Sequence, residues 1–223
     1  MKRNPIDLIG RSAAIAAVLL SPIGARAAQM AYEGFDYASG SSNLSGQAGG
    51  TGWNGGWQTV NNGSADVASS SLVAGASSPT GYDALSTGNS CNLPTNRRVG
   101  RFLDTSTNGP FGARGYRDGN GRIGADGTTV YLSFMQQPNG TTSYYEFEFH
   151  RGNLGDPGRI GGVGNDQGGT NVNLRAPNGT HTFIAAGNTN VNFYVVRIDF
   201  KAGNDDVYVY QNPTSATEPA PTL

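Results

Sequence analysis

The chain has 223 residues, enough for one β-sandwich of ordinary size, and a formal net charge of −1. Glycine is abundant, at 34 residues, and charged residues make up only 14%, which excludes long helices because glycine and short polar residues favour turns. Aromatic and β-branched residues gather in alternating runs, which excludes full disorder. The sequence has no basic stripe, which argues against nucleic acid and anionic membranes as partners.

Residues 1–27 have the pattern of a secretory signal peptide. Basic residues near the start are followed by a short apolar stretch, residues 13–20, and Ala25-Arg26-Ala27 fits a small-x-small cleavage site. This stretch is much shorter than the ~20 residues that span a bilayer. We therefore expect an exported protein, extracellular, on the cell surface or periplasmic, with no transmembrane segment in the mature chain. The alternative is a buried N-terminal helix.

The first half of the mature chain gives weak strand signals. Residues 32–56 are rich in Gly and Ser with embedded aromatics, and residues 61–90 are small and polar, with strand-like fragments at 65–67 and 72–73. A weak strand is expected at 97–103. Residues 104–128 read as a long loop, because a glycine recurs every few positions.

Firm strands follow, each with the alternation of a half-buried strand. In residues 145–150 the aromatics at 145, 147 and 149 share one face, and Glu146, Glu148 and His150 share the other. A turn at 203–206 predicts a hairpin between the last two strands. The firm strands are expected at 129–135, 145–150, 193–200 and 207–210, and weaker ones at 159–163, 171–175 and 181–186.

Strands separated by turns, with no helical periodicity between them, predict a sandwich or barrel. We expect one all-β domain over residues 28–212 and an irregular tail at 213–223. Cys91 is the one cysteine, so neither an internal disulfide nor a Cys-based zinc site is expected. His150 and His181 are the only histidines and give little support to zinc.

Several segments together resemble a family of exported bacterial proteins with a concanavalin A-like, laminin-G-like jelly roll, many of which carry a Pro-Glu-Pro C-terminal sorting tail. The segments are AYEGFDYASG, GGTGWNGGW, TVYLSFMQQ, RIGGVGNDQGG and YVVRIDFKAGNDDVYVYQNP. The resemblance runs from about Ala31 to Pro213. It implies a β-sandwich of two antiparallel sheets, a concave face that often binds glycans, and calcium at a sheet edge in many relatives. Glu218-Pro219 is followed by neither an apolar helix nor a basic cluster, so a sorting tail is not expected.

The concanavalin-like fold also houses laminarinase-type glycoside hydrolases with a Glu-x-Asp-x-x-Glu strand, which supplies the two carboxyl groups of retaining hydrolysis. Residues 146–151 come nearest to this motif, with Glu146 and Glu148 in the first two places. Arg151 replaces the last acid. No catalytic residues are therefore assigned, and a non-catalytic protein is expected.

Glu146, Glu148 and His150 have two interpretations. They are either the solvent face of an antiparallel strand, or they line a groove and form hydrogen bonds with sugar hydroxyls. Arg197 and Asp199, two apart on one face, could join such a groove or could form an ion pair with each other. Alanine at Glu148 or His150 is then expected to weaken glycan binding without unfolding the protein.

Calcium is the one ion that the residues favour, because it prefers several oxygen ligands on flexible turns. Asp205 and Asp206 lie in a tight turn, and Glu33 and Asp36 lie near the mature N-terminus. In jelly rolls the termini often pair as neighbours, so these four acids are candidate ligands. The alternative is that Asp205 and Asp206 only form the turn.

Trp53 and Trp57 flank Asn54-Gly55-Gly56 and are either a platform that stacks on sugar rings or a plug at the end of the sandwich. Two functions of different classes remain open. The first is a secreted or surface binding module for polysaccharide, and the second is a structural or adhesive protein that binds a surface protein or matrix. A glycoside hydrolase is a distant third.

Overall fold

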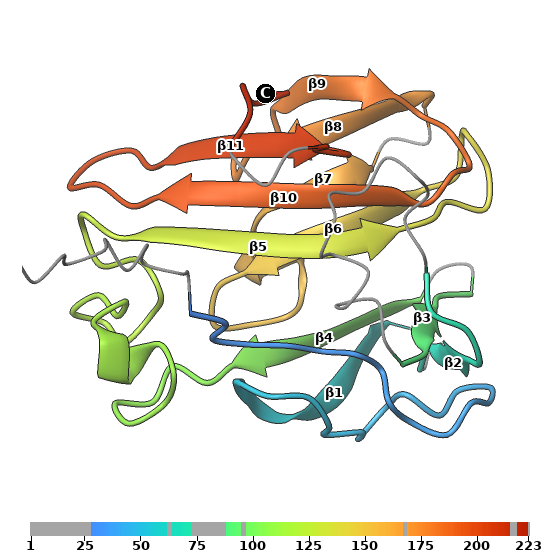
Figure 1. Ribbon diagram of the computed structural model, residues 1–223, viewed down its shortest axis with the longest axis horizontal. Coiled ribbons are helices and arrows are strands. Elements are labelled where there is room, and N and C mark those ends of the chain that lie inside the picture. Colours follow the sequence, from blue (N-terminus) through green and yellow to red (C-terminus); the bar gives the residue numbers. More distant parts are fainter. Residues whose placement is uncertain are drawn as a thin grey trace, which may run out of the picture.

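The computed structural model describes residues 28–61, 64–72, 88–94, 97–166, 169–214 and 218–222, and these form an all-β protein (Figure 1). The predicted signal peptide lies outside the described residues. Among the residues described, no helix is long and apolar enough to cross a membrane. The strands are β1 (Trp53–Asn61), β2 (Asp66–Ala68), β3 (Ser90–Asn92), β4 (Arg98–Leu103), β5 (Thr129–Gln136), β6 (Tyr145–His150), β7 (Arg159–Asn165), β8 (Asn171–Arg175), β9 (His181–Ala186), β10 (Asn192–Asp199) and β11 (Asp206–Gln211).

Two antiparallel sheets pack face to face, as the sequence predicts. One has the strand order β11-β10-β5 and the other the order β6-β7-β8-β9 (Figure 1). Alternate residues of each sheet meet in one core, which includes the fully buried Val163 and Val172 of one sheet and Val196 and Val209 of the other. Because side chains alternate along a strand, the other face of each sheet points away from this core.

A second, smaller part of the protein contains the β1–β4 and β2–β3 pairs, which lie below the sandwich in Figure 1. Its core holds the buried Leu44, Ala65 and Val67, with Phe35 and Trp57 packed against them. Arg98 of β4 reaches Glu148 of β6, 3.2 Å from Nε to Oε2, so an ion pair joins the two parts.

The strands predicted in the second half of the chain are all present, and so is the strand predicted at 97–103. Asp199 pairs with Asp206 at the end of the β10–β11 hairpin, so its loop covers residues 200–205. Residues 104–128 are largely irregular, with one short 3-10 helix, η2 (Gly112–Arg114). The all-β, antiparallel prediction is therefore confirmed.

Strand β1 is not predicted from the sequence. Its segment contains Gly55 and Gly56, which read as a turn, and its pairing with β4 has a register shift between Asn54 and Gln58. Gly55 has a φ of 81°, and a Cβ on Gly56 would lie 2.6 Å from the carbonyl oxygen of Gly46. The glycines thus permit a bulge and a close backbone contact inside a strand.

Candidate functional site

The polar row of β6 is buried, although one interpretation of the sequence places it in solvent. Glu146, Glu148 and His150 do share the face opposite the sandwich core, as predicted. Their side chains are only 2%, 9% and 8% exposed, whereas Phe147 on the aromatic face is 38% exposed. The solvent-face interpretation is therefore wrong, and the reason is that charged side chains from other strands cover this row.

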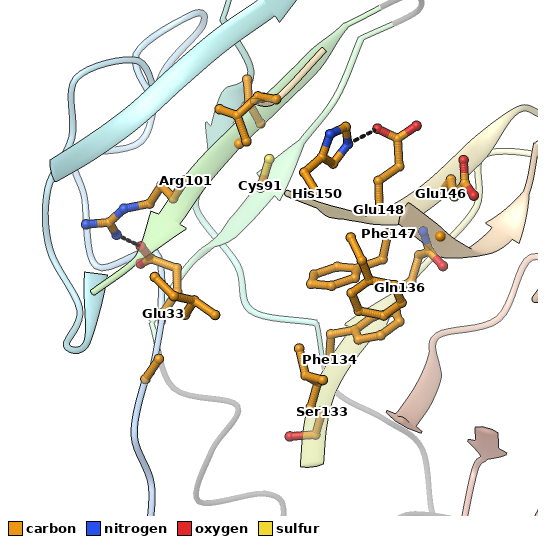
Figure 2. A pocket seen from close by; sticks show the side chains of 18 of the residues that line it. Glu33, Cys91, Arg101, Ser133, Phe134, Gln136, Glu146, Phe147, Glu148 and His150 are labelled. Carbon is orange, nitrogen blue, oxygen red and sulfur yellow. Dashed lines mark hydrogen bonds and ion pairs between the residues drawn. The ribbon is translucent and has the colours of Figure 1, made fainter. Parts of the chain in front are cut away.

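Glu148 is held by three partners. Its Oε1 accepts a hydrogen bond from Arg159 Nη1 at 2.7 Å, and its Oε2 lies 2.9 Å from His150 Nε2 (Figure 2). Arg98 approaches the same Oε2 from β4. Burial acts to raise the pKa of Glu148, but the hydrogen bonds from His150 and Arg159 outweigh it, so the pKa is lowered. Glu148 is therefore an anion at neutral pH.

Glu146 lies two residues away in a different electrostatic environment. Its Oε2 is 3.9 Å from Arg159 Nη1 and 3.8 Å from Arg175 Nη1, beyond hydrogen-bond distance. Within the described part of the chain, neither carboxyl oxygen has a hydrogen-bond partner. Burial, then the charges of Glu148 and Asp166, raise the pKa of Glu146 to about 7. Near neutral pH, Glu146 is therefore partly protonated, whereas Glu148 is ionised.

Further charged groups extend the network across the sheet. Asp166, which follows β7, pairs with Arg175 Nη1 at 3.0 Å and with His181 Nε2 at 2.5 Å. On the other side, Arg98 Nη1 pairs with Asp156 at 2.7 Å. Sequence reasoning misses these partners because they lie on separate strands. The register that sets Gly162 opposite Arg175, and Arg175 opposite His181, is seen only in the structure.

Gly162 makes room for Glu146, since a Cβ there would lie 2.2 Å from Glu146 Oε1. Gly162→Ala is expected to lower the free energy of unfolding by about 1–2 kcal/mol, because overpacking displaces the buried carboxyl. Urea denaturation measures this loss. Gly203→Ala is the control, because a Cβ there would meet no atom within 4 Å. Equal stability of both variants would contradict the tight packing of Glu146 against β7.

A cavity of about 2820 Å³ adjoins the row and is lined by parts of β4, β5 and β6. Phe147 points into it and stacks on Phe134, with ring centroids 4.2 Å apart (Figure 2). Tyr144, directly before β6, also lines the cavity and is 56% exposed. Because Phe147 lies on one side of the edge strand β6 and Glu148 and His150 on the other, the cavity extends around both sides of this strand (Figure 2).

Trp53 and Trp57 surround a buried ion pair between Glu33 and Arg101. The Arg101 guanidinium lies 5.1 Å from the ring centre of Trp53 and 5.8 Å from that of Trp57. Trp57 Nε1 donates to Glu33 Oε2 at 3.0 Å, and Trp53 Nε1 donates to the carbonyl of Tyr32 at 2.8 Å. These contacts favour the interpretation of the tryptophans as a plug over that of a sugar platform.

Arg197 and Asp199 do not join the β6 row, which corrects that expectation. They lie on the outer face of the β11-β10-β5 sheet, whereas Glu146 and Glu148 lie on the outer face of the other sheet. Asp199 accepts two hydrogen bonds from Arg197, from Nε at 2.9 Å and Nη2 at 2.8 Å. The alternative prediction, a same-face ion pair, is confirmed.

The four candidate calcium ligands are not gathered into one site. No group of three or more His, Cys, Asp or Glu side chains that could hold a metal occurs among the residues described. Glu33 accepts hydrogen bonds from Arg101, Tyr37, Trp57 and the Phe35 amide. Asp206 pairs with Lys201, and Asp205 accepts from the Lys201 amide. Protein donors thus bind oxygens of Glu33, Asp205 and Asp206, and the described residues do not show the expected convergence of the four acids.

Comparisons of the chain with protein-family models, curated proteins and solved structures found no match.

Proposed function

We propose that this chain is a non-catalytic carbohydrate-binding module whose ligand occupies the cavity beside β6. The observation that carries the proposal is the placement of the exposed ring of Tyr144 in a cavity that also contains Glu148 and His150. This function agrees with the resemblance to exported concanavalin A-like proteins. Export and the jelly-roll connectivity remain predictions from the sequence.

The chemistry of the cavity matches that of a sugar chain. A sugar ring has an apolar face that stacks on aromatic rings, and hydroxyl groups that both donate and accept hydrogen bonds. Near neutral pH, the Glu148 carboxylate can accept a hydrogen bond from a sugar hydroxyl. Arg98, which also lines the cavity, can donate a hydrogen bond to one. At about 2820 Å³, the cavity exceeds the roughly 300–1,000 Å³ of sites for small ligands, which favours several linked sugars over one.

Binding without catalysis is favoured by the state of Glu148. Retaining hydrolysis requires a free carboxylate as nucleophile beside a protonated acid. Both oxygens of Glu148 are already engaged by Arg159, His150 and Arg98, which lowers its nucleophilicity. Arg151, in the place of the third acid of the laminarinase motif, is exposed.

The first experiment is a glycan array with the chain from residue 28 onward, followed by titration of the best ligand. Tyr144→Ala is expected to weaken binding by about five- to tenfold, through the loss of one stacking contact. Phe183→Ala is the matched control, since Phe183 is also 56% exposed and does not line the cavity. An equal loss in both variants would contradict this site. If a folded sample binds no glycan on the array, the structural or adhesive function is favoured. If the sample releases reducing sugar from a glycan, a hydrolase is favoured.

Tyr144 is a cleaner probe than Glu148. The sequence alone suggests that alanine at Glu148 leaves the fold intact. In the structure, however, the removal of this carboxylate leaves Arg159 without its close partner and Arg98 with only the exposed Asp156. Weaker binding by Glu148→Ala could therefore arise either from the lost carboxylate or from a less stable fold, and the two causes would not be separated.

A further inference from the structure

Three side chains on the outer face of the β11-β10-β5 sheet surround the carboxylate of Glu218. Tyr131 from β5 donates its hydroxyl to Oε2 at 3.1 Å, and Arg197 from β10 donates Nη1 to Oε1 at 2.8 Å. The hydroxyl of Tyr210 from β11 also donates to Oε1. Each of the three strands contributes one donor, and together they bind both oxygens of one carboxylate. The hydrogen bonds from Tyr210 and Arg197 hold the pKa of Glu218 below its usual value.

Arg197 is held in place by contacts other than the one with Glu218. Asp199 binds the Nε and Nη2 atoms of Arg197, which leaves Nη1 directed at Glu218. The guanidinium also lies over the ring of Tyr208, 5.3 Å from its centre. Asp199 is itself fixed by the hydroxyl of Thr129 at 2.7 Å. A preorganised guanidinium of this kind loses little conformational entropy when it binds an anion.

The segment that carries Glu218 lies at the surface, and few backbone hydrogen bonds join it to the sheet. Residues 218–222 are all exposed. Beyond the carboxylate, their contacts with β11 are a hydrogen bond from the Thr222 amide to the Val209 carbonyl at 2.9 Å and one from the Gln211 amide to Thr222 Oγ1 at 3.2 Å. Strand β11 is the edge of its sheet. The described end of the chain is therefore joined to the edge strand β11 by one backbone hydrogen bond, while Glu218 reaches over the outer face of the sheet.

We propose that Tyr131, Arg197 and Tyr210 form a carboxylate-binding site for an extended peptide, and that the C-terminal segment of a second copy of this chain can occupy it in place of Glu218 in cis. Every copy carries a segment that fits the site, with a glutamate at 218 and a backbone donor at 222. Pro219 and Pro221 favour the extended form. The site lies on the sheet that faces away from the β6 row, so this proposal stands apart from carbohydrate binding.

The test uses the full chain with Glu218→Gln, which keeps the shape of the side chain but removes its charge. A tethered segment has an effective concentration in the millimolar range, so the cis carboxylate must be removed before exchange is visible. Fluorescence anisotropy then follows a labelled synthetic peptide of residues 213–223. We expect saturable binding to the Glu218→Gln chain, and binding at least about tenfold weaker to the wild-type chain because of competition in cis.

The control peptide carries Gln in place of Glu218 and is expected to bind the Glu218→Gln chain about tenfold more weakly, as a charge-assisted hydrogen-bond network is lost. Thermal unfolding monitors the fold of each chain. Equal binding of the two peptides would overturn the carboxylate site, and no binding of either would overturn exchange between copies. Binding of polygalacturonate but not of the peptide would also overturn the proposal, since the site would then take the carboxylate of a sugar.

Discussion

Arg101→Met is expected to lower the free energy of unfolding by about 3–5 kcal/mol, because it leaves a buried carboxylate without its cation. The side chains of Arg101 and Glu33 are 2% and 7% exposed, and Nη1 lies 2.5 Å from Oε2 (Figure 2). Arg101 also donates to the carbonyls of Gly49 and Gly55, each at 2.8 Å. The substitution thus removes the hydrogen bonds that join β4 to Gly49, before β1, and to Gly55, within β1. Urea denaturation at neutral pH measures the change.

Two further variants separate the ion pair from general effects of the substitution. Arg114→Met removes an exposed arginine and is expected to change stability by less than about 0.5 kcal/mol. The double variant Arg101→Met with Glu33→Gln leaves no buried charge at this position. It is expected to recover part of the lost free energy of unfolding. A loss below about 1 kcal/mol in Arg101→Met would show that water already solvates the pair.

Glu146→Gln is expected to stabilise the protein above neutral pH and to flatten its pH dependence. The pKa of Glu146 rises from 4.5 to about 7 on folding, so the folded state binds this proton more tightly than the unfolded state. In the wild type, the contribution of this group is therefore fully present below about pH 4.5 and is lost as the pH rises to about 7. The loss is about 3 kcal/mol for this rise in pKa, and glutamine abolishes it.

Unfolding curves in urea between about pH 3 and pH 8.5 test this expectation, because Glu146 titrates above pH 4.5 and Glu148 below it. Glu148→Gln is the control of opposite sign, because the pKa of Glu148 is lowered. Its carboxylate adds stability above its ordinary pKa, and this stability is lost as the pH falls. If wild type and Glu146→Gln have parallel pH profiles, Glu146 is ionised throughout and the proposed protonated carboxyl is absent.

The strands of the second half could be predicted because their alternation is strong. The pattern over β10 places Tyr194, Val196 and Ile198 on one face, and the structure packs these side chains into the core. Strand β1 could not be predicted, because local glycine content signals a turn. Its strand form depends on pairing with β4, which lies about forty residues further along the chain.

The candidate site could be predicted only in part. Alternation correctly assigns Glu146, Glu148 and His150 to one face, but it says nothing of what covers that face. Arg159 and Arg175 arrive from neighbouring strands and Arg98 from the smaller part of the protein. In the same way, the hydrogen bond from Arg197 to Glu218 joins the C-terminal segment to β10. No local sequence pattern predicts this contact.

The sequence by itself determined the all-β class, most strand positions and the residues that share each face. These follow from a period of two, which is a local property of the backbone. Only the tertiary structure decided that Glu146 is buried with a pKa raised to about 7, that Glu148 is an anion, and that Arg197 lies on the opposite sheet. The protonation of a carboxyl depends on the water removed from it and on the charges nearby, and both are set by strands that are distant in the sequence.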